Sequence, residues 1–305
     1  MQNEKHHEDI KRAIDFIEAN LASPISVEDV CEVSATSSWQ FQRLFRLYTG
    51  DSIGNYLRTR RLTCSAQDLM QNSGKRILDI AVEYQFGSHE AFTRAFKKMF
   101  GVPPGEVESH KSEIRLKQKI QLSEKQFLHN LRGIQREPTI IKFPERSFVG
   151  TEIQIPSPFS EDLDYIEMVS NQWLEFNPRR KEIADRKQGV GYGLVLSPSG
   201  SMIENIFPYV ASVEINAGSK ASIPHGLKRY IIGEQTYACF EKRGLANRTR
   251  MSMDYIYGFW LPQSDYQRVK GYDIEIFDHR LRLDQPDSIS TYCIPVELRE
   301  RPTKR

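Results

Sequence analysis

Phe41-Gln42-Arg43-Leu44-Phe45-Arg46-Leu47-Tyr48-Thr49-Gly50 is a segment that this chain uses twice, because it recurs in altered form as Phe92-Thr93-Arg94-Ala95-Phe96-Lys97-Lys98-Met99-Phe100-Gly101. In each copy two Phe residues stand four positions apart, on one face of a helix, and the closing Gly suits a left-handed C-cap. Upstream of each copy lie a second apolar helix pattern and a Ser at an N-cap position. The sequence therefore predicts two helix-turn-helix units.

The composition is that of a water-soluble protein with two domains. The chain has 305 residues, of which 39% are hydrophobic and 27% charged, with a net charge of +2. No apolar run approaches the roughly 18 residues of a membrane span, and the start, MQNEKHHEDI, lacks the pattern of a signal peptide. We expect a cytoplasmic protein that does not contact a membrane.

The four cysteines, Cys31, Cys64, Cys239 and Cys293, are scattered without a CxxC pair. This spacing indicates neither a disulfide framework nor a zinc site, so we interpret them as reduced core residues. The histidines lack metal-ligand spacing, and no Ser or Cys lies in a nucleophile-elbow context. The sequence predicts no cofactor, no metal site and no catalytic residues.

Three regions follow from the pattern along the chain. Residues 8–109 contain a packing helix at 10–21, the two helix-turn-helix units and a spacer helix at 52–72, and they end at Pro103-Pro104. Residues 110–137 form a basic linker, either a solvated tether or an additional contact to phosphate. Residues 138–299 are rich in β-branched and aromatic runs, with helix patterns at 160–176 and 251–261. We predict an all-α domain followed by an α+β domain with a largely antiparallel sheet.

Eight segments of the last region read as strands: 140–143, 148–155, 190–196, 209–215, 230–232, 237–240, 272–277 and 290–296. The glycines Gly191 and Gly193 belong to one of them, and Gly189 directly precedes it. Because no helix pattern follows, we interpret them as part of a strand and not as a phosphate cradle.

The second helix of each unit carries side chains suited to the DNA major groove, where Arg recognises guanine and Gln recognises adenine. The candidate contacts are Ser38, Trp39, Gln42, Arg43 and Arg46 in the first unit, and His89, Glu90, Thr93, Arg94 and Lys97 in the second. We expect Gln42 and Arg43 to read bases and Arg46 to bind a phosphate, with Thr93 and Arg94 as base readers in the second unit. Helix-turn-helix shapes also occur in proteins that never bind nucleic acid, but two copies with matching Arg positions favour DNA.

Residues 8–108 resemble the DNA-binding domain of AraC/XylS-type transcription regulators, and within that family the MarA, SoxS and Rob group. The segments that carry the resemblance are Ser38-Trp39-Gln40-Phe41-Gln42-Arg43-Leu44-Phe45-Arg46, Tyr56-Leu57-Arg58, Phe86-Gly87-Ser88-His89-Glu90-Ala91-Phe92-Thr93-Arg94-Ala95-Phe96-Lys97 and Phe100-Gly101-Val102-Pro103-Pro104. The turns of such domains usually have Gly where this chain has Ala35 and Gln85, so we expect strain there if φ is positive. The resemblance implies double-stranded DNA and RNA polymerase as partners.

Residues 138–299 resemble the GyrI-like effector-binding domain of Rob-type and multidrug-sensing regulators. The matching pieces are Gly191-Tyr192-Gly193, Tyr237-Ala238-Cys239-Phe240, Phe259-Trp260-Leu261-Pro262-Gln263-Ser264, Gly271-Tyr272-Asp273-Ile274-Glu275-Ile276-Phe277 and Ile294-Pro295-Val296. The resemblance implies a sensor of small, lipophilic and cationic molecules, with Glu275 as the acidic residue.

The expected effector site follows from this resemblance. Glu275, Trp260 and Tyr192 should line one pocket, with Tyr209 and Tyr237 as neighbours, because a carboxylate among aromatic faces attracts a cation. Two alternatives remain for this domain, a small-molecule hydrolase and a protein-interaction module. Phe277 stands where the family commonly has Tyr, and the missing hydroxyl argues against the enzyme.

Overall fold

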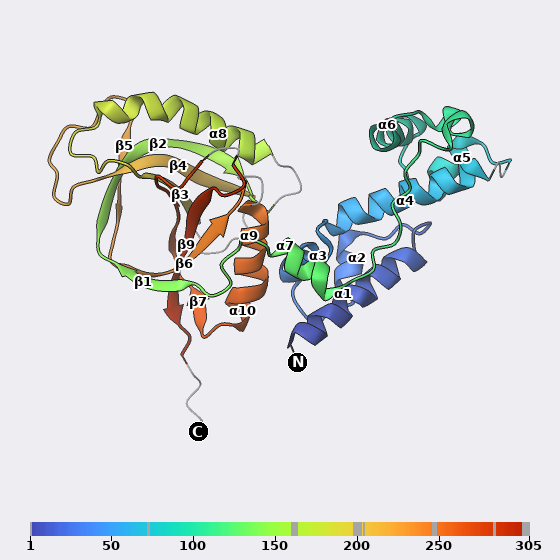
Figure 1. The fold of residues 1–305 in the computed structure, drawn as a ribbon, viewed down its shortest axis with the longest axis horizontal. Helices are drawn as coiled ribbons and strands as arrows, with labels where there is room; N and C mark the ends of the chain where they lie inside the picture. Colours follow the sequence, from blue (N-terminus) through green and yellow to red (C-terminus); the bar gives the residue numbers. More distant parts are fainter. Residues whose placement is uncertain are drawn as a thin grey trace, which may run out of the picture. The chain divides into compact units, whose positions relative to one another are not determined.

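The computed structural model describes residues 2–71, 74–159, 164–197, 203, 205–245, 249–282 and 285–300. The chain divides into two compact units, Met1–Asn130 and Leu131–Arg305. The first unit is helical and the second is built on an antiparallel sheet with helices, which is the predicted fold class (Figure 1).

The first unit consists of helices α1 (Gln2–Ala19), α2 (Val27–Cys31), α3 (Ser38–Thr49), α4 (Ile53–Met70), α5 (Ile77–Glu83), α6 (His89–Phe100) and α7 (Glu124–Asn130), with short 3-10 turns at Pro104–Glu106 and Glu108–His110. Helix α1 begins earlier than predicted, because His6 and Asp9 are buried polar residues that hide the apolar periodicity. The spacer helix is α4, close to its predicted bounds.

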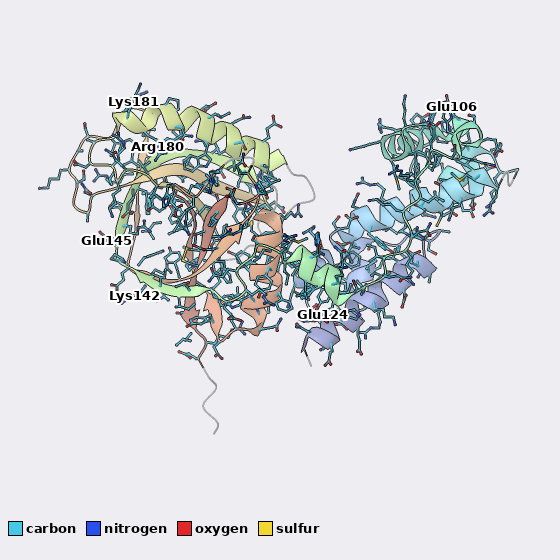
Figure 2. All side chains as sticks on the ribbon, viewed as in Figure 1. Glu106, Glu124, Lys142, Glu145, Arg180 and Lys181 are labelled. Atoms are coloured by element: carbon cyan, nitrogen blue, oxygen red, sulfur yellow. A yellow bond between two sulfur atoms is a disulfide. The ribbon has the colours of Figure 1, made fainter. Side chains whose placement is uncertain are left out.

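The chain after the second helix-turn-helix unit is not a solvated tether. Ile114 is buried in the core that α4, α5 and α6 share, and the backbone oxygen of Lys117 accepts a hydrogen bond from Arg60. Helix α7, which begins at Glu124 (Figure 2), packs on α3. The tether prediction is therefore wrong for this stretch, because its apolar residues are spaced too irregularly for the sequence to reveal a docking face.

Two contacts join α7 to the end of α3. The ring of Phe127 stacks on Tyr48 with 4.4 Å between centroids. The amide of Asn130 donates to the backbone oxygen of Leu47 at 2.7 Å, a carbonyl in the last turn of α3 that no intrahelical N–H can reach. Helix α7 thus caps the C-terminal end of α3.

The second unit consists of strands β1 (Thr139–Phe143), β2 (Arg146–Pro156), β3 (Gly191–Ser197), β4 (Ile206–Ile215), β5 (Lys228–Ile232), β6 (Gln235–Arg243), β7 (Tyr266–Arg268), β8 (Gly271–Phe277) and β9 (Ile289–Leu298). Its helices are α8 (Asp164–Phe176), a 3-10 segment Asn177–Glu182, α9 (Thr249–Asp254), a π-helical segment Tyr255–Trp260 and α10 (Leu261–Gln263). All eight predicted strands are present. The short β7 was not predicted, and residues 160–163 of the predicted helix lie outside the described residues.

The sheet is antiparallel, with strand order β1-β6-β9-β8-β3-β4-β2-β5 and β7 paired to β9. One face carries a core cluster to which β5 contributes Tyr230 and Ile232, while Phe143 of β1 packs against it. Since β1 and β5 are the two ends of the strand order, the sheet curls until both reach one core. Helix α8 packs on β2 and β4 (Figure 1).

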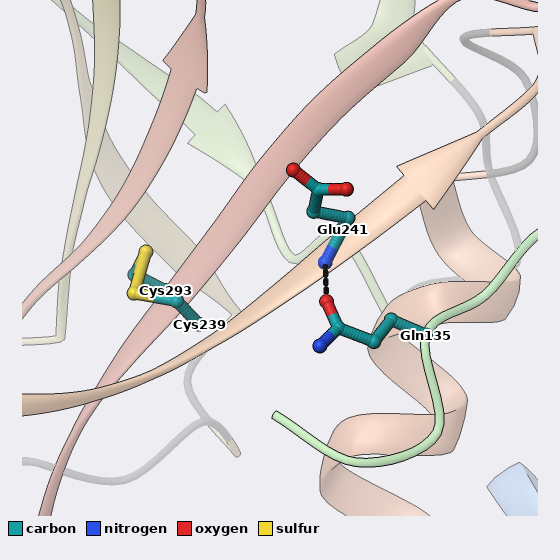
Figure 3. Close-up of a disulfide and its surroundings, with 4 residues drawn as sticks. All are labelled: Gln135, Cys239, Glu241 and Cys293. Carbon is teal, nitrogen blue, oxygen red and sulfur yellow. Dashed lines mark hydrogen bonds between the residues drawn. A yellow bond between two sulfur atoms is a disulfide. The ribbon is translucent and has the colours of Figure 1, made fainter. Parts of the chain in front are cut away.

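Two of the cysteines form a disulfide, contrary to the prediction that all four are reduced. Cys239 of β6 and Cys293 of β9 are directly opposed partners in the antiparallel ladder, with a Cα–Cα distance of 4.0 Å (Figure 3). Cys31 and Cys64 are free. The sequence did not reveal the bond because strand pairing brings together residues that are 54 positions apart.

Replacing Asn130 by Ala should destabilise the first unit by about 1–3 kcal/mol, because the Leu47 carbonyl loses its donor. Urea unfolding of the full chain, followed by circular dichroism, measures the change. Lys125→Ala, an exposed position on the same helix, is the control and should stay within about 0.5 kcal/mol of the original protein. Equal midpoints for both variants would show that α7 does not support α3.

Candidate functional site

The two reading helices, α3 and α6, are built in the same way. Ser37 and Ser88 cap their N-termini by accepting hydrogen bonds from Gln40 and Ala91. Each helix ends at a left-handed Gly with φ of 82°. The Phe pairs at positions 41 and 45 and at 92 and 96 are fully buried. Buried rings on one face therefore hold each helix with its polar face outward, as the repeat predicts.

The turns before these helices differ from each other. Gln85 has a φ of +64°, whereas Ala35 does not have a positive φ. The expected strain is thus present in the second turn only. There the side chain of Gln85 donates to the backbone oxygen of Ala22 at 2.7 Å, a contact that offsets part of the cost.

The predicted DNA contacts differ in how accessible they are. Ser38, His89, Glu90, Arg94 and Lys97 are exposed, and Trp39, Gln42, Arg46 and Thr93 are half-buried. Arg43 is only 4% exposed: its guanidinium lies 3.4 Å from the Trp39 ring centroid and donates to the Trp39 carbonyl. The matching arginines of the repeat therefore have different surroundings, which their shared register did not reveal.

The second unit contains a cavity of about 740 Å³ between α8 and the sheet. Its wall is mainly apolar, with Ile155, Tyr165, Ile166, Val169, Trp173, Val195, Met253 and Phe277. A few polar groups enter it, among them Arg180, Tyr209, Lys242, Glu275, Asp278, Arg282 and Tyr292. A cavity of this size, with few polar groups, is typical of a small-molecule site.

Glu275 is one of the carboxylates that line this cavity. Its Oε2 accepts a hydrogen bond of 2.9 Å from the Tyr209 hydroxyl, and the Trp173 indole N–H donates to the same hydroxyl at 2.8 Å. Burial raises the pKa of Glu275, and the charge of Asp273 adds to this rise, whereas Tyr209 and Lys242 counter it. The chain Trp173, Tyr209, Glu275 thus fixes a desolvated carboxyl group beside aromatic rings.

Strand β3 supports this arrangement because two of its residues on the cavity face, Gly191 and Gly193, have no side chain. A Cβ on Gly193 would lie 2.5 Å from the Tyr209 hydroxyl oxygen and 2.6 Å from Glu275 Oε2. A Cβ on Gly191 would lie 3.0 Å from the Trp173 ring. These residues form a strand, as predicted. Because these two glycines have no side chain, Trp173, Tyr209 and Glu275 can pack directly against the backbone of β3.

A second carboxylate on the same face of β8, Asp273, has a different role. It is fully buried, and it accepts hydrogen bonds from Tyr292 at 2.8 Å and from Tyr257. Its Oδ1 also pairs with the Arg268 guanidinium at 2.9 Å. In the described part of the chain, no ion pair joins Glu275 to a basic side chain. Asp273 is therefore neutralised within the fold, while Glu275 faces the cavity.

The structure brings together only part of the predicted effector site. Tyr209 and Glu275 line the cavity, but Tyr192 and Tyr237 belong to the core cluster on the opposite face of the sheet. Trp260 packs against Phe240 and Tyr266 and does not line the cavity. The prediction that Glu275, Trp260 and Tyr192 share one pocket is wrong, because Tyr192 and Gly193 are adjacent in β3 and adjacent strand residues face opposite sides.

Sequence reasoning missed several residues of the cavity: Trp173, Phe277, Lys242, Tyr292 and Arg180. Trp173 had the helical spacing of a core residue, and no pattern distinguished core from cavity. Lys242 offered no usable signal either. A Lys that is only 6% exposed is unusual, but this burial becomes visible only in the fold.

Comparison with known proteins agrees with this geometry. Residues 136–297, more than half of the chain, match the GyrI-like small molecule binding domain, and residues 30–110 match a helix-turn-helix domain. The chain belongs to the GyrI-like family. Transcriptional regulator Rob of Salmonella typhimurium is 29% identical over 280 residues, which cover 87% of this chain and 89% of Rob.

Two further relatives match the helical unit. Multiple antibiotic resistance protein MarA of Escherichia coli is 43% identical over 122 residues, which cover 40% of this chain and 88% of MarA. The uncharacterized HTH-type transcriptional regulator YbfP of Bacillus subtilis is 46% identical over 96 residues, which cover 32% of either chain. The match thus spans about a third of YbfP. Together these findings confirm an AraC-type DNA-binding transcription regulator with a C-terminal GyrI-like domain that binds a small molecule.

The residues that the structure describes contain no group of three or more His, Cys, Asp or Glu placed to hold a metal ion. In the same ranges no helix has the length and apolar character needed to cross a membrane.

Gly193→Ala should separate Tyr209 from Glu275 and destabilise the GyrI-like domain by about 1–3 kcal/mol, because the new methyl group occupies the space of both oxygens. Thermal unfolding measures the change. Gly233→Ala is the matched control: nothing lies within 4 Å of its Cβ position, and its φ is not in the left-handed region. If both variants unfold at the same temperature, the contact at Gly193 is not a constraint on the cavity.

Proposed function

We propose that this AraC-type regulator senses a lipophilic molecule that carries a positive charge, and that Glu275 is the counter-charge. The observation that carries the proposal is a half-buried carboxyl group that lines an aromatic cavity, held by Tyr209 and not by a basic side chain. A cation would form an ion pair with the carboxylate and contact the faces of the neighbouring rings. It would also favour the ionised form of Glu275, which burial disfavours.

The other charges of the cavity limit how strongly it attracts a cation. Asp278 pairs with Arg280, and Arg282 pairs with Asp287. Lys242 donates to Thr249 Oγ1 at 2.8 Å, and its charge lowers the pKa of Glu275. We therefore infer that the ligand is recognised by a local contact at Glu275 together with apolar burial, and not by a strongly negative cavity.

We propose further that α3 and α6 read two separate boxes of DNA from one chain. Both helices belong to the same unit and differ in sequence, which supports a monomer on an asymmetric site with boxes about one helical turn, roughly 34 Å, apart. In the first box Gln42 is our candidate base reader; Arg43 joins it only if its guanidinium leaves Trp39. In the second box Arg94 is the exposed candidate, with Thr93 beside it. As in the family, we propose action on RNA polymerase in the cytoplasm.

Glu275→Gln should weaken binding of tetraphenylphosphonium, a lipophilic cation, by about 1–3 kcal/mol, because the shape is kept and the charge removed. Titration calorimetry measures the affinity. DNA affinity without the cation should be unchanged.

The control for this test is Glu234→Gln, an exposed carboxylate that pairs with Lys142, which should bind like the original protein. Because burial raises the pKa of Glu275, cation affinity should fall as the pH is lowered through that raised pKa. Glu275→Gln should lack this dependence. Saturable binding that is equal in all three proteins at every pH contradicts recognition by charge.

Arg94→Ala should cost about 1–3 kcal/mol of DNA affinity and relax the preference at one base pair, whereas Lys97→Ala should weaken all sequences alike and flatten the salt dependence. Both residues are exposed on α6. Competition binding with single-base variants of a selected site distinguishes the two effects. An equal, sequence-independent loss in both variants would falsify the assignment of base reading to Arg94.

A further inference from the structure

A basic recess adjoins the cavity at the end of α8. It has a volume of about 460 Å³ and is lined by Arg180, Lys181 and Arg186 together with Asn177, Gly189 and neighbouring residues. Asn177, Arg180 and Gly189 also line the larger cavity. Figure 2 shows Arg180 and Lys181 at this end of α8. The two hollows therefore share a wall, and Arg180 stands between them.

The recess concentrates positive charge. The residues that line it include three basic side chains and, within the described chain, no acidic one. The Arg180 guanidinium donates to the backbone oxygen of Val190, and that of Arg186 donates to the backbone oxygen of Ile183, each at 3.0 Å. Burial lowers the pKa of Arg180, and the charge of Arg186 lowers it further. An anion placed here would relieve this repulsion and form charge-assisted hydrogen bonds.

The charge of the neighbouring Arg179, by contrast, is balanced by a carboxylate. Its guanidinium forms two hydrogen bonds to the Glu182 carboxylate, and it also donates to the backbone oxygen of His225. It lines neither hollow. Arg180 instead has carbonyl and like-charged neighbours, so the adjacent positions differ in their capacity for an anion.

The groups that a ligand would meet are arranged in order along β3 and the residue before it. Arg180 contacts Val190, Trp173 lies against Gly191, and Glu275 lies against Gly193. An extended chain rises about 3.3 Å per residue, so the two backbone positions that Arg180 and Glu275 contact, Val190 and Gly193, are about 10 Å apart. A positive group, an aromatic wall and a negative group thus follow one another along one line.

We propose that the effector is a dipolar amphiphile, whose anionic group binds in the basic recess at Arg180 and Arg186 while its cationic group binds Glu275 about 10 Å away. The inference rests on the proposed function of the cavity and adds the second charge and its separation. An apolar, preferably aromatic, segment joins the two groups and packs against Trp173. The anionic group is a carboxylate, sulfonate or phosphate, since the guanidinium fork suits all three.

The test uses the full chain and a rigid probe, 4'-(aminomethyl)biphenyl-4-carboxylic acid, whose charged groups are held at about this separation. Its carboxamide keeps the shape and removes the negative charge, and its N-acetyl derivative removes the positive charge. Titration calorimetry should show the acid binding about tenfold more tightly than the carboxamide, since charge-assisted hydrogen bonds are the stronger ones. Arg180→Gln and Arg186→Gln should each reduce this ratio towards one, while Arg179→Gln should keep it.

The outcomes separate the two proposals. The carboxamide isolates the contribution of the positive charge, because its affinity should be reduced in Glu275→Gln. Arg179→Gln, at a residue that lines neither hollow, is the control and should bind the acid and the carboxamide like the original protein. Equal binding of acid and carboxamide to the original protein overturns the recess inference but leaves the proposed function standing. A tenfold gain that persists in both Arg180→Gln and Arg186→Gln also overturns it. Carboxamide binding that does not depend on Glu275, or no binding of any probe, overturns both.

Discussion

The structure of the effector-binding domain depends on one contact, the hydrogen bond between Tyr209 and Glu275. Both side chains pack directly against the backbone of Gly193. Three strands contribute to it: β4 supplies the tyrosine, β8 the carboxyl group and β3 the bare backbone. Helix α8 joins through the Trp173 indole. Because the contact leaves no room for a side chain at Gly193, the register of β4, β3 and β8 and the position of α8 are coupled to one another. The cavity is the space that remains once this contact is made.

The same face of β8 shows how a fold separates structural from functional charge. Asp273 and Glu275 stand two residues apart and point to the same side. Asp273 is enclosed by Arg268, Tyr257 and Tyr292, so its charge is neutralised within the fold. Among the described residues, Glu275 accepts a hydrogen bond from the Tyr209 hydroxyl and has no ion pair, so its charge is available to a ligand. The two residues are both acidic, so residue type does not explain their different roles. The side chains that surround each carboxylate explain them.

The DNA-binding unit uses one sequence pattern twice but not symmetrically. Both reading helices have a Ser cap, a left-handed Gly and a buried Phe pair. Only α3 is capped by α7 through Asn130, and only its arginine is buried on a Trp ring. The helix that caps α3 is therefore the last element of the first unit before the chain enters the effector domain. A monomer with two different reading helices is suited to an asymmetric site.

The sequence by itself determined the elements and the family, because local periodicity, capping residues and the repeat at Phe41 and Phe92 are encoded within short segments. It also pointed to Glu275. Only the tertiary structure decided which aromatics accompany that carboxylate: alternation along β3 sends Tyr192 to the opposite face, and sheet curling takes Tyr237 into the core. Strand pairing likewise joined Cys239 to Cys293, and packing docked residues 114–130 on the helical unit. Each of these depends on residues far apart in the chain, whose pairing is fixed by the energy of the whole core and leaves no local signal.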